Sequence, residues 1–591
     1  MPSSAPLAKH ATPLPPVARR PAGSRWGWAF LIDVAVFAAV FAVIFGVYSI
    51  GRSWLGPVRA ESAISQDPRS LPLYALYSLV RILLAYGLSL VFALAYGYAA
   101  AKSRRAEVIL IPLLDILQSI PVLSFLPGVM LAMVALFPSR QLGVELGSII
   151  LIFTGQVWNI AFSFYSSLKS IPRDLHEAAI IYRFSLWQRF TELDLPFSTI
   201  GLVWNSMMSV AGGWFFLMAC EMFVLGDRDF RLPGLGSYLQ TAASSGNTRA
   251  IVWGVAAMVA VIVLMDQLIW RPVIAWADKF KFEQVESSDS AHNSLLSFIR
   301  KESVVIRTYR RILHPIVNWL TVNLAIGAKR AADSFSAPKG KRSRRWLGWV
   351  IAAAAALALL YGLYRTVIEL TALHRADYVE LAGSAGRTFL RVNLALLIGA
   401  LWTVPVGVAI GLTPRFARLM QPLVQLAASI PATALFPVIL LFLIHLRGGI
   451  EIAAMLLMLL GTQWYILFNV IAGAMAIPTD LKEAATIFRF KRMDRWRHLI
   501  LPGIFPYLVT GMVTASGGAW NASIVAEYFH FQGHIVEARG LGSTISRASD
   551  AGHFNLLLAS TLIMAALVVL INRLLWRKLY RLASTRFKLE S

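Results

Sequence analysis

The sequence predicts an all-α integral membrane protein with about twelve transmembrane helices in two tandem six-helix halves. Composition, long apolar stretches and an internal duplication predict this fold. Of the 591 residues, 57% are hydrophobic and 15% charged, and the mean hydropathy is +0.63. A soluble chain of this length needs more charge to cover its surface, so the excess apolar surface is expected to face lipid. A bilayer core takes about 20 apolar residues per helix, and about a dozen such stretches are present.

The predicted spans divide the chain into two halves, residues 28–275 and 346–577. The first half holds Trp28–Ile50, Tyr74–Ala101, Val108–Phe137, Gly147–Ser167, Ser198–Val224 and Ile251–Val273. The second half holds Trp346–Ile368, Phe389–Leu412, Leu419–Leu446, Ile452–Met475, Tyr507–Phe529 and Phe554–Leu575. The remaining segments are a disordered tail (1–27), a linker (276–345) and a C-terminal tail (578–591).

The formal net charge of +24 is concentrated in particular loops and tails. The linker alone holds 14 Lys and Arg against 6 Asp and Glu. By the positive-inside rule these segments are cytoplasmic, which places both termini inside and gives each half an even number of spans. The placement of the charge disfavours nucleic acid as a partner. Residues 295–324 fit a basic amphipathic helix on the inner leaflet better than an extra span at 312–328, which would reverse the second half.

The two halves are a tandem duplication that runs in one direction. At an offset of 310, Arg81, Ser119-Ile120-Pro121 and Pro127 recur as Arg391, Ser429-Ile430-Pro431 and Pro437. At an offset of 306, Gly155, Trp158, Trp214, Glu221, Gly234-Leu235-Gly236 and Trp270-Arg271 recur as Gly461, Trp464, Trp520, Glu527, Gly540-Leu541-Gly542 and Trp576-Arg577. Two parallel copies are expected to pack about a pseudo-twofold axis along the membrane normal, with a shared pathway between them.

The best-matched repeat is a predicted cytoplasmic loop, residues 171–196 and 477–502, in which 14 of 26 residues are identical. Each copy contains Asp-Leu-x-Glu-Ala-Ala and ends on Leu-x-Leu-Pro. We expect a short helix here, capped by Asp174 or Asp480, with Glu177 or Glu483 reaching back in a capping box. The paired alanines are expected to leave a low surface that another protein can approach.

These loops resemble the signature of the integral-membrane subunits of binding-protein-dependent ABC importers: Glu-Ala-Ala, three residues, Gly, nine residues, and Ile-x-Leu-Pro. The resemblance implies a type I importer-like fold in which the loops are coupling helices that bind an ATPase. It assigns this role to Asp174, Glu177, Ala178, Ala179, Arg183, Asp480, Glu483, Ala484, Ala485 and Arg489. Arg183 and Arg489 replace the family's Gly. Either the helix continues through them, because a positive φ costs Arg ~1 kcal/mol or more, or they contact the ATPase directly.

Further features are similar to the nitrate, sulfonate, taurine and bicarbonate importers, including their fused, duplicated permeases. These features are Ser-Ile-Pro followed by a second Pro, a Glu late in the fifth span, and Gly-Leu-Gly after it. The resemblance implies a permease of the bacterial inner membrane that imports a small anion by alternating access. It also implies an extracytoplasmic solute-binding protein and a separate cytoplasmic ATPase pair, identical or not, which carries ATP and Mg²⁺.

Polar and aromatic residues inside the predicted spans are candidates for the solute pathway, because polar groups are costly in a bilayer. They are Gln118, Ser119, Gln156, Trp158, Asn159, Asn205, Trp214, Glu221, Ser429, Gln463, Trp464, Asn469, Trp520, Asn521 and Glu527. The alternative for each is helix–helix hydrogen bonding or packing. Glu221 and Glu527 are expected near the outer face, gating or pairing with a cation. Arg81 and Arg391 are possible partners or anion contacts, and snorkelling to the interface is the alternative.

Signatures of other classes are absent from the sequence. Lys339-Gly340-Lys341-Arg342 lacks the leading Gly and the hydroxyl residue of a phosphate-binding loop, so this chain is expected to carry no ATP and to be no enzyme. His530 and His534 lack a third ligand, so no metal is expected. An ion-driven secondary transporter is the main rival, and a membrane-embedded enzyme or sensor is the second.

Overall fold

A computed structural model describes residues 54, 64–138, 141–225, 228–280, 353, 357 and 360–586, all within one compact unit of the chain. The predicted span Trp28–Ile50, most of the span Trp346–Ile368 and the amphipathic segment 295–324 lie outside these residues. Residues 360–371 are helical. The two halves are described below through the elements that occupy equivalent places in them.

The described part of the first half is almost entirely helical. Its helices are α2 (Leu71–Lys102), α3 (Arg104–Ser119), α4 (Leu126–Leu136), α5 (Leu142–Lys169), α6 (Arg173–Ile181), α7 (Leu186–Arg189), α8 (Leu195–Glu221), α9 (Leu235–Ser244), α10 (Thr248–Met265) and α11 (Arg271–Ala277). Two short strands, β1 (Val224–Leu225) and β2 (Arg228–Asp229), pair as an antiparallel hairpin between α8 and α9.

The described part of the second half repeats this order. Its helices are α16 (Arg375–Leu412), α17 (Pro414–Ser429), α18 (Ala432–Leu443), α19 (Gly449–Met475), α20 (Thr479–Ile487), α21 (Arg492–Arg495), α22 (Leu501–Ala526), α23 (Leu541–Asp550), α24 (Phe554–Ile571) and α25 (Arg577–Arg586). The antiparallel hairpin of β3 (Tyr528–Phe531) and β4 (His534–Glu537) follows α22.

Eight helical stretches among the described residues are long and apolar enough to cross a membrane. They are Pro68–Lys102, Leu142–Lys169, Leu186–Glu221, Thr248–Ala277, Arg375–Leu412, Gly449–Met475, Arg492–Ala526 and Phe554–Ala583. Each contains one of the predicted spans or most of it. The prediction of an all-α membrane protein with tandem halves is therefore confirmed, with two small hairpins in addition.

The predicted spans Val108–Phe137 and Leu419–Leu446 are wrong as continuous helices. The chain leaves the helix at Ile120 and Ile430, whose ψ angles are 128° and 118°, and a new helix begins after Pro121 or Pro431. Proline disfavours the helical conformation of the residue before it and lacks the N–H that a continuing helix needs. Helix α4 has 11 residues, about 16 Å, which is too short to cross a bilayer core of about 30 Å.

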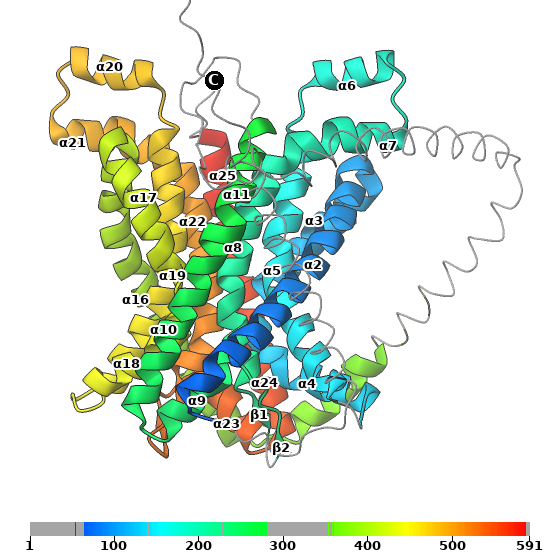
Figure 1. Cartoon of the computed structure of the whole chain (residues 1–591), viewed down its shortest axis with the longest axis vertical. Coiled ribbons are helices and arrows are strands. Elements are labelled where there is room, and N and C mark those ends of the chain that lie inside the picture. Colours follow the sequence, from blue (N-terminus) through cyan, green and yellow to red (C-terminus); the bar gives the residue numbers. More distant parts are fainter. Residues whose placement is uncertain are drawn as a thin grey trace, which may run out of the picture. The chain divides into compact units, whose positions relative to one another are not determined.

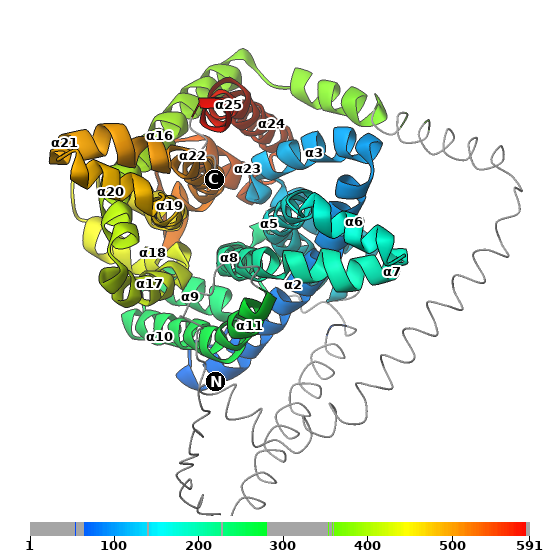
Figure 2. The same cartoon turned by 90° about the horizontal axis from the view of Figure 1, so that it is seen from above.

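Packing follows the duplication. Helix α5 packs against both α2 and α8, and α19 packs in the same way against α16 and α22. Helices of the two halves also contact each other: α10 packs against α18, and α24, the equivalent of α10, packs against α3. Figure 2 shows the two sets of helices around a common centre. This arrangement agrees with the parallel pseudo-twofold relation that the repeat predicts.

Four π-helical turns recur at equivalent places. Phe190–Asp194 and Trp496–Ile500 lead into α8 and α22, while Asp266–Trp270 and Asn572–Trp576 interrupt the last long helix of each half. Because π-turns insert an extra residue into a helix, their exact recurrence shows that the duplication extends to details of the backbone.

Candidate functional site

The repeated loops (residues 171–196 and 477–502) lie at the same end of the described unit. Figure 1 shows α6 and α20 at the top, projecting beyond the long helices, whereas α9 and α23 lie at the opposite end. Each loop consists of a nine-residue helix, a turn, a four-residue helix and a π-turn. The two elements that the sequence matches best therefore reach the same side of the molecule.

The expected capping of the loop helices is wrong. The residues before the first helical turn are Pro172 and Pro478, and neither helix has a side-chain cap. Asp174 and Asp480 instead lie inside the first turn. A carboxylate in the first turn still stabilises the helix by its attraction to the positive end of the helix dipole, by about 0.3–1 kcal/mol for an exposed group.

Of the two alternatives for Arg183 and Arg489, a helix that continues through them is wrong. Both arginines have positive φ, 50° and 51°, directly after the helix ends. The N–H of Phe184 donates to the Ala179 carbonyl at 2.9 Å, and the N–H of Arg183 donates to the Ile180 carbonyl at 2.9 Å. The second loop repeats both bonds, so each helix ends in a Schellman motif with Arg in the place that usually holds Gly.

Apolar side chains are exposed where each loop turns. We call Ile181, Tyr182 and Trp187 of the first loop and Ile487, Phe488 and Met493 of the second loop the apolar tips. Ile181 and its repeat equivalent Ile487 are 76% and 77% exposed. Of the paired alanines, Ala179 and Ala485 are buried, and only the first of each pair is partly accessible. The apolar tips, rather than the alanines, therefore supply most of the exposed apolar surface, and such surface marks interaction sites.

In each loop an arginine at the end of the four-residue helix forms a hydrogen bond to the nine-residue helix. In the first loop Nη2 of Arg189 donates to Nδ1 of His176 at 2.9 Å, and in the second loop Nη2 of Arg495 donates to Oγ1 of Thr486 at 3.2 Å. Burial, together with Arg189 and Lys102, lowers the pKa of His176 from its usual value. The neutral imidazole is therefore favoured, which suits an acceptor nitrogen.

The first loop has a further anchor. Lys102 at the end of α2 forms an ion pair of 2.9 Å with the buried carboxylate of Asp194 in the π-turn. At the equivalent positions the second half has Leu412 and Ile500. An ion pair therefore anchors the first loop, whereas the second loop has two apolar residues at the equivalent positions.

At the opposite end, the first half contains a buried polar cluster of Arg81, Glu145 and Glu221, which we call the first cluster. Arg81 from α2 binds Glu145 from α5 through two nitrogens, at 2.6 and 2.8 Å, and binds Glu221 at the end of α8 at 2.8 Å. Glu221 also accepts from Ser78 Oγ and from the backbone N–H of Gly236, both within 2.8 Å. The cluster therefore joins α2, α5, α8 and the start of α9.

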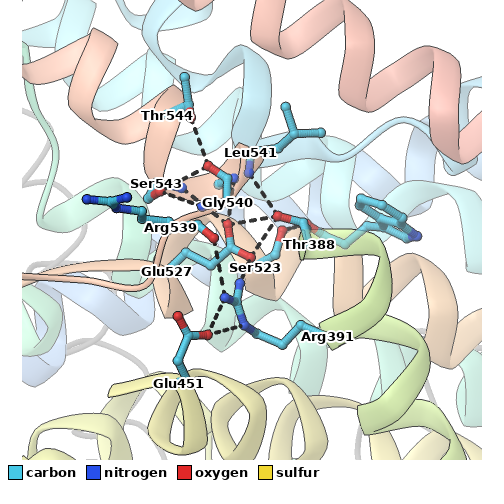
Figure 3. Close-up of polar contacts among 12 residues, drawn as sticks. Thr388, Arg391, Glu451, Ser523, Glu527, Arg539, Gly540, Leu541, Ser543 and Thr544 are labelled. Carbon is cyan, nitrogen blue, oxygen red and sulfur yellow. Dashed lines mark hydrogen bonds and ion pairs between the residues drawn. The ribbon is translucent and has the colours of Figure 1, made fainter. Parts of the chain in front are cut away.

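The second cluster, Arg391, Glu451 and Glu527, repeats this arrangement (Figure 3). Glu527 accepts from Thr388 Oγ1 at 2.8 Å and from the N–H of Gly542 at 2.8 Å. One difference is large: the side chain of Glu451 is 55% exposed, whereas that of Glu145 is 3% exposed. The first cluster is sealed from solvent and the second is open on one side.

The repeated Gly-Leu-Gly motif is explained by these clusters. A Cβ on Gly234 would lie 2.3 Å from the carboxylate of Glu221, and one on Gly540 would lie 2.2 Å from that of Glu527. Any larger residue would therefore push the loop off the carboxylate that binds it. Of the alternatives for Glu221 and Glu527, pairing with Arg81 and Arg391 is what the structure shows, and the burial of both arginines excludes snorkelling.

The other pathway candidates are scattered. Gln118 is exposed, and the side chains of Ser119 and Ser429 lie outside the described residues. Gln463 accepts from Trp402, and Asn205 and Asn469 bond to their own or a neighbouring helix. Trp464 and Asn521 line one small cavity and Trp214 lines another, whereas Gln156 and Trp520 are buried and Trp158 and Asn159 partly so. These residues do not form one site.

Sequence reasoning missed Glu145 and Glu451, although they recur at the offset of 306. It also missed a cavity of about 520 Å³ that residues of both halves line, which no motif marks. Among the described residues no group of three His, Cys, Asp or Glu could hold a metal ion. Nε2 of His530 lies 3.1 Å from Oδ2 of Asp550.

The fold is thus that of a duplicated membrane protein, with two parallel helical halves, repeated loops at one end and buried polar clusters at the other. Residues 87–268 and 403–582 each match the family described as the inner membrane component of binding-protein-dependent transport systems. The chain belongs to this family, whose members are transport subunits rather than enzymes.

Curated relatives include the taurine transport system permease of Escherichia coli, 27% identical over 31% of this chain and 62% of its own length. A nitrate import permease of Leptolyngbya laminosa is 25% identical over 31% of this chain and 62% of its own. A putative aliphatic sulfonates permease of Bacillus subtilis is 27% identical over 34% and 71%. The chain thus spans less than two thirds of the first two relatives.

Proposed function

We propose that this chain supplies both transmembrane halves of an ATP-driven importer, which moves a small anion such as nitrate, a sulfonate, taurine or bicarbonate inward by alternating access. One observation carries the proposal: the two repeated loops reach the same end and expose equivalent apolar tips there (Figure 1). A single motor placed on that side can contact both. An ion-driven secondary transporter binds its driving ions within the membrane and does not need two loops that contact a motor.

The motor is a separate pair of ATPase subunits in the cytoplasm, with ATP and Mg²⁺ bound there. Each subunit takes one apolar tip, and its movement reaches the long helices through the π-turns at Phe190–Asp194 and Trp496–Ile500. Asp174, Glu177, Arg183 and their equivalents are exposed beside the tips and contribute polar contacts at the rim. One copy of the chain serves one ATPase pair, because it supplies both loops.

The remaining components follow from the family. An extracytoplasmic binding protein delivers the solute to the end that carries the two polar clusters. The chain lies in the bacterial inner membrane with both termini in the cytoplasm, on the side of the loops. The relatives' names, which include taurine, nitrate, sulfonates and bicarbonate, support a solute with an anionic group.

The test is affinity purification of the full chain from its native membranes, with Mg²⁺-dependent ATP hydrolysis measured in the eluate. Ile181→Asp and Ile487→Asp place a charge at the centre of each apolar tip and should each remove most of the hydrolysis. Val379→Asp is the matched control, since Val379 is similarly exposed but lies near the start of α16. If hydrolysis survives both tip variants, or if uptake follows an imposed ion gradient without ATP, the proposal fails.

A further inference from the structure

The small cavity that Asn521 lines has a volume of about 110 Å³ and lies between the two halves, and we call it the middle cavity. Its walls are the interior of α8 from the first half and of α19 and α22 from the second, with the turn between α17 and α18. Figure 2 shows α8 facing α19 and α22 across the common centre. All three helices belong to stretches long and apolar enough to cross a membrane, so we place the middle cavity within the bilayer.

One side chain of this cavity, Tyr465 of α19, reaches from the second half to the first. Gly212 of α8 and Gly518 of α22 are equivalent positions of the repeat, at the offset of 306. A Cβ on Gly212 would lie 3.2 Å from Oη of Tyr465, and one on Gly518 would lie 3.5 Å from its Cε2. The tyrosine ring therefore lies between two equivalent glycines, across the boundary of the halves.

The hydroxyl of Tyr465 forms no hydrogen bond to any residue that the structure describes. The side chain lines the middle cavity and is only partly buried, whereas the unpaired amide of Gln156 is sealed inside the protein. A tyrosine hydroxyl away from bulk water usually finds a partner. An unpaired hydroxyl at the wall of a cavity therefore indicates a place for a polar guest.

The polar groups of the wall can donate hydrogen bonds, and none of them is charged. Among the described residues that line the middle cavity there is no Asp, Glu, Lys, Arg or His. Oδ1 of Asn521 accepts from the N–H of Leu123 at 3.4 Å, and its Nδ2 donates to the carbonyl of Gly517 at 3.1 Å. Nδ2 has a second hydrogen, and the Tyr465 hydroxyl has one of its own. Two hydrogens therefore remain for a guest, and no carboxylate opposes an anion.

This polar pair belongs to the second half alone. At the offset of 306, Tyr465 corresponds to Asn159, and Asn521 corresponds to Phe215. The first half contributes Phe215 and Phe216 to the same wall. The middle cavity thus has one polar side and one aromatic side, which suits a single guest rather than a symmetric pair.

We propose that the middle cavity is a transit site for a singly charged anion, to which Tyr465 and Asn521 donate neutral hydrogen bonds. The inference rests on the proposed function and names the residue, Tyr465, that its solute must contact inside the membrane. A solute that has to leave again cannot be held too tightly, and neutral donors bind an anion less tightly than a lysine or arginine would. A doubly charged anion would lose more hydration without gaining a cation, so the site favours a single charge.

The test measures alkylation of a single cysteine by iodoacetate and by iodoacetamide, a charged and a neutral reagent of similar size. The full chain in lipid nanodiscs carries Cys220→Ala, because Cys220 is its only cysteine, and Ala211→Cys, because Ala211 lines the middle cavity and is partly exposed. Val379→Cys, exposed near the start of α16, replaces Ala211→Cys in a reference chain that corrects for the intrinsic reactivity of the reagents. The rate ratio of iodoacetate to iodoacetamide should be about tenfold or more higher at position 211 than at position 379, since a hydrogen bond to a charged group contributes about that much.

Two variants test the role of the hydroxyl. Tyr465→Phe keeps the ring and should lower the ratio at position 211 about tenfold, with alkylation by iodoacetamide retained. Gly212→Ala places a Cβ against Oη of Tyr465 and should lower the ratio several-fold. Gly517→Ala is the matched control, because it lies beside Gly518 in α22 and its Cβ would have nothing within 4 Å, so the ratio should not change. Thermal unfolding of each variant shows that it is folded.

Absence of alkylation at position 211 by both reagents, or a ratio no higher there than at position 379, would overturn the inference. A ratio that Tyr465→Phe and Gly212→Ala leave unchanged would overturn it as well. The proposed function is tested separately, because alkylation needs no ATP and the tip variants do not touch the middle cavity. A chain that hydrolyses ATP through its tips, and whose cavity favours the neutral reagent, would keep its function and refute the anion site.

Discussion

The difference in exposure between the two polar clusters predicts that Arg81 matters more for stability than Arg391. The variant Arg81→Met keeps a side chain of similar length but removes the positive charge, so Glu145 and Glu221 remain buried without their cation. In Arg391→Met, only Glu527 is left buried, because Glu451 is 55% exposed and can be solvated. The number of stranded buried carboxylates is therefore two in one variant and one in the other.

The magnitude follows from this count. Removing one partner of a buried ion pair costs about 3–5 kcal/mol, and an exposed pair contributes about 0–1 kcal/mol. Arg391→Met should therefore cost about 3–5 kcal/mol, and Arg81→Met should cost more, up to about twice as much. Adding Glu145→Gln to Arg81→Met removes one stranded charge, so the double variant should recover toward the stability of Arg391→Met.

The assay is unfolding of the purified chain in mixed micelles by a graded denaturing detergent, followed by tryptophan fluorescence, together with the folded yield in membranes. Arg249→Met, at an exposed position, is the control and should change the unfolding free energy by less than about 0.5 kcal/mol. Equal costs for Arg81→Met and Arg391→Met would refute the argument from burial. A double variant no more stable than Arg81→Met would refute the argument from stranded charge.

Three further predictions concern single residues. Arg183→Gly and Arg489→Gly relieve a positive φ and should stabilise each loop by up to about 1 kcal/mol. ATP hydrolysis should nevertheless fall, because each variant loses the polar contact proposed for the guanidinium group; full hydrolysis would refute that contact. Gly540→Ala should lower the unfolding free energy by several kcal/mol, because its Cβ would meet the carboxylate of Glu527. Gly517→Ala, whose Cβ would have nothing within 4 Å, should instead stabilise α22 by up to about 1 kcal/mol. Similar effects of the two variants would contradict the close approach of Gly540 to Glu527. The pKa of His176 is lower in the folded chain than in the unfolded one, so the unfolded state binds more protons below about pH 6.5 and the free energy of unfolding should fall there. An unfolding series from pH 8 to pH 5 measures this fall, and His176→Gln should make it smaller.

Much of the loop could be predicted from the sequence, and the errors have local causes. The register of Glu-Ala-Ala and its closing proline located α6 and α20 within a few residues. The capping prediction failed because the N-cap residues are Pro172 and Pro478, two residues before the aspartates that were expected to cap. The sequence left the turn at Arg183 open, and the alternative of a continuing helix is wrong because a conformational cost of ~1 kcal/mol is small beside the two backbone hydrogen bonds that the Schellman motif provides.

The sequence by itself determined the membrane class, the duplication and the position of the repeated loops, because apolar length and repeat register are properties of the chain alone. Only the tertiary structure decided that Arg81 meets Glu145 and Glu221, which lie 64 and 140 positions further along the chain. It also decided that Arg231 and Asp550, which are far apart in the sequence, line the same cavity. Such pairings depend on which helix faces turn toward each other. The packing of many apolar side chains determines those faces collectively, and no local sequence pattern does so.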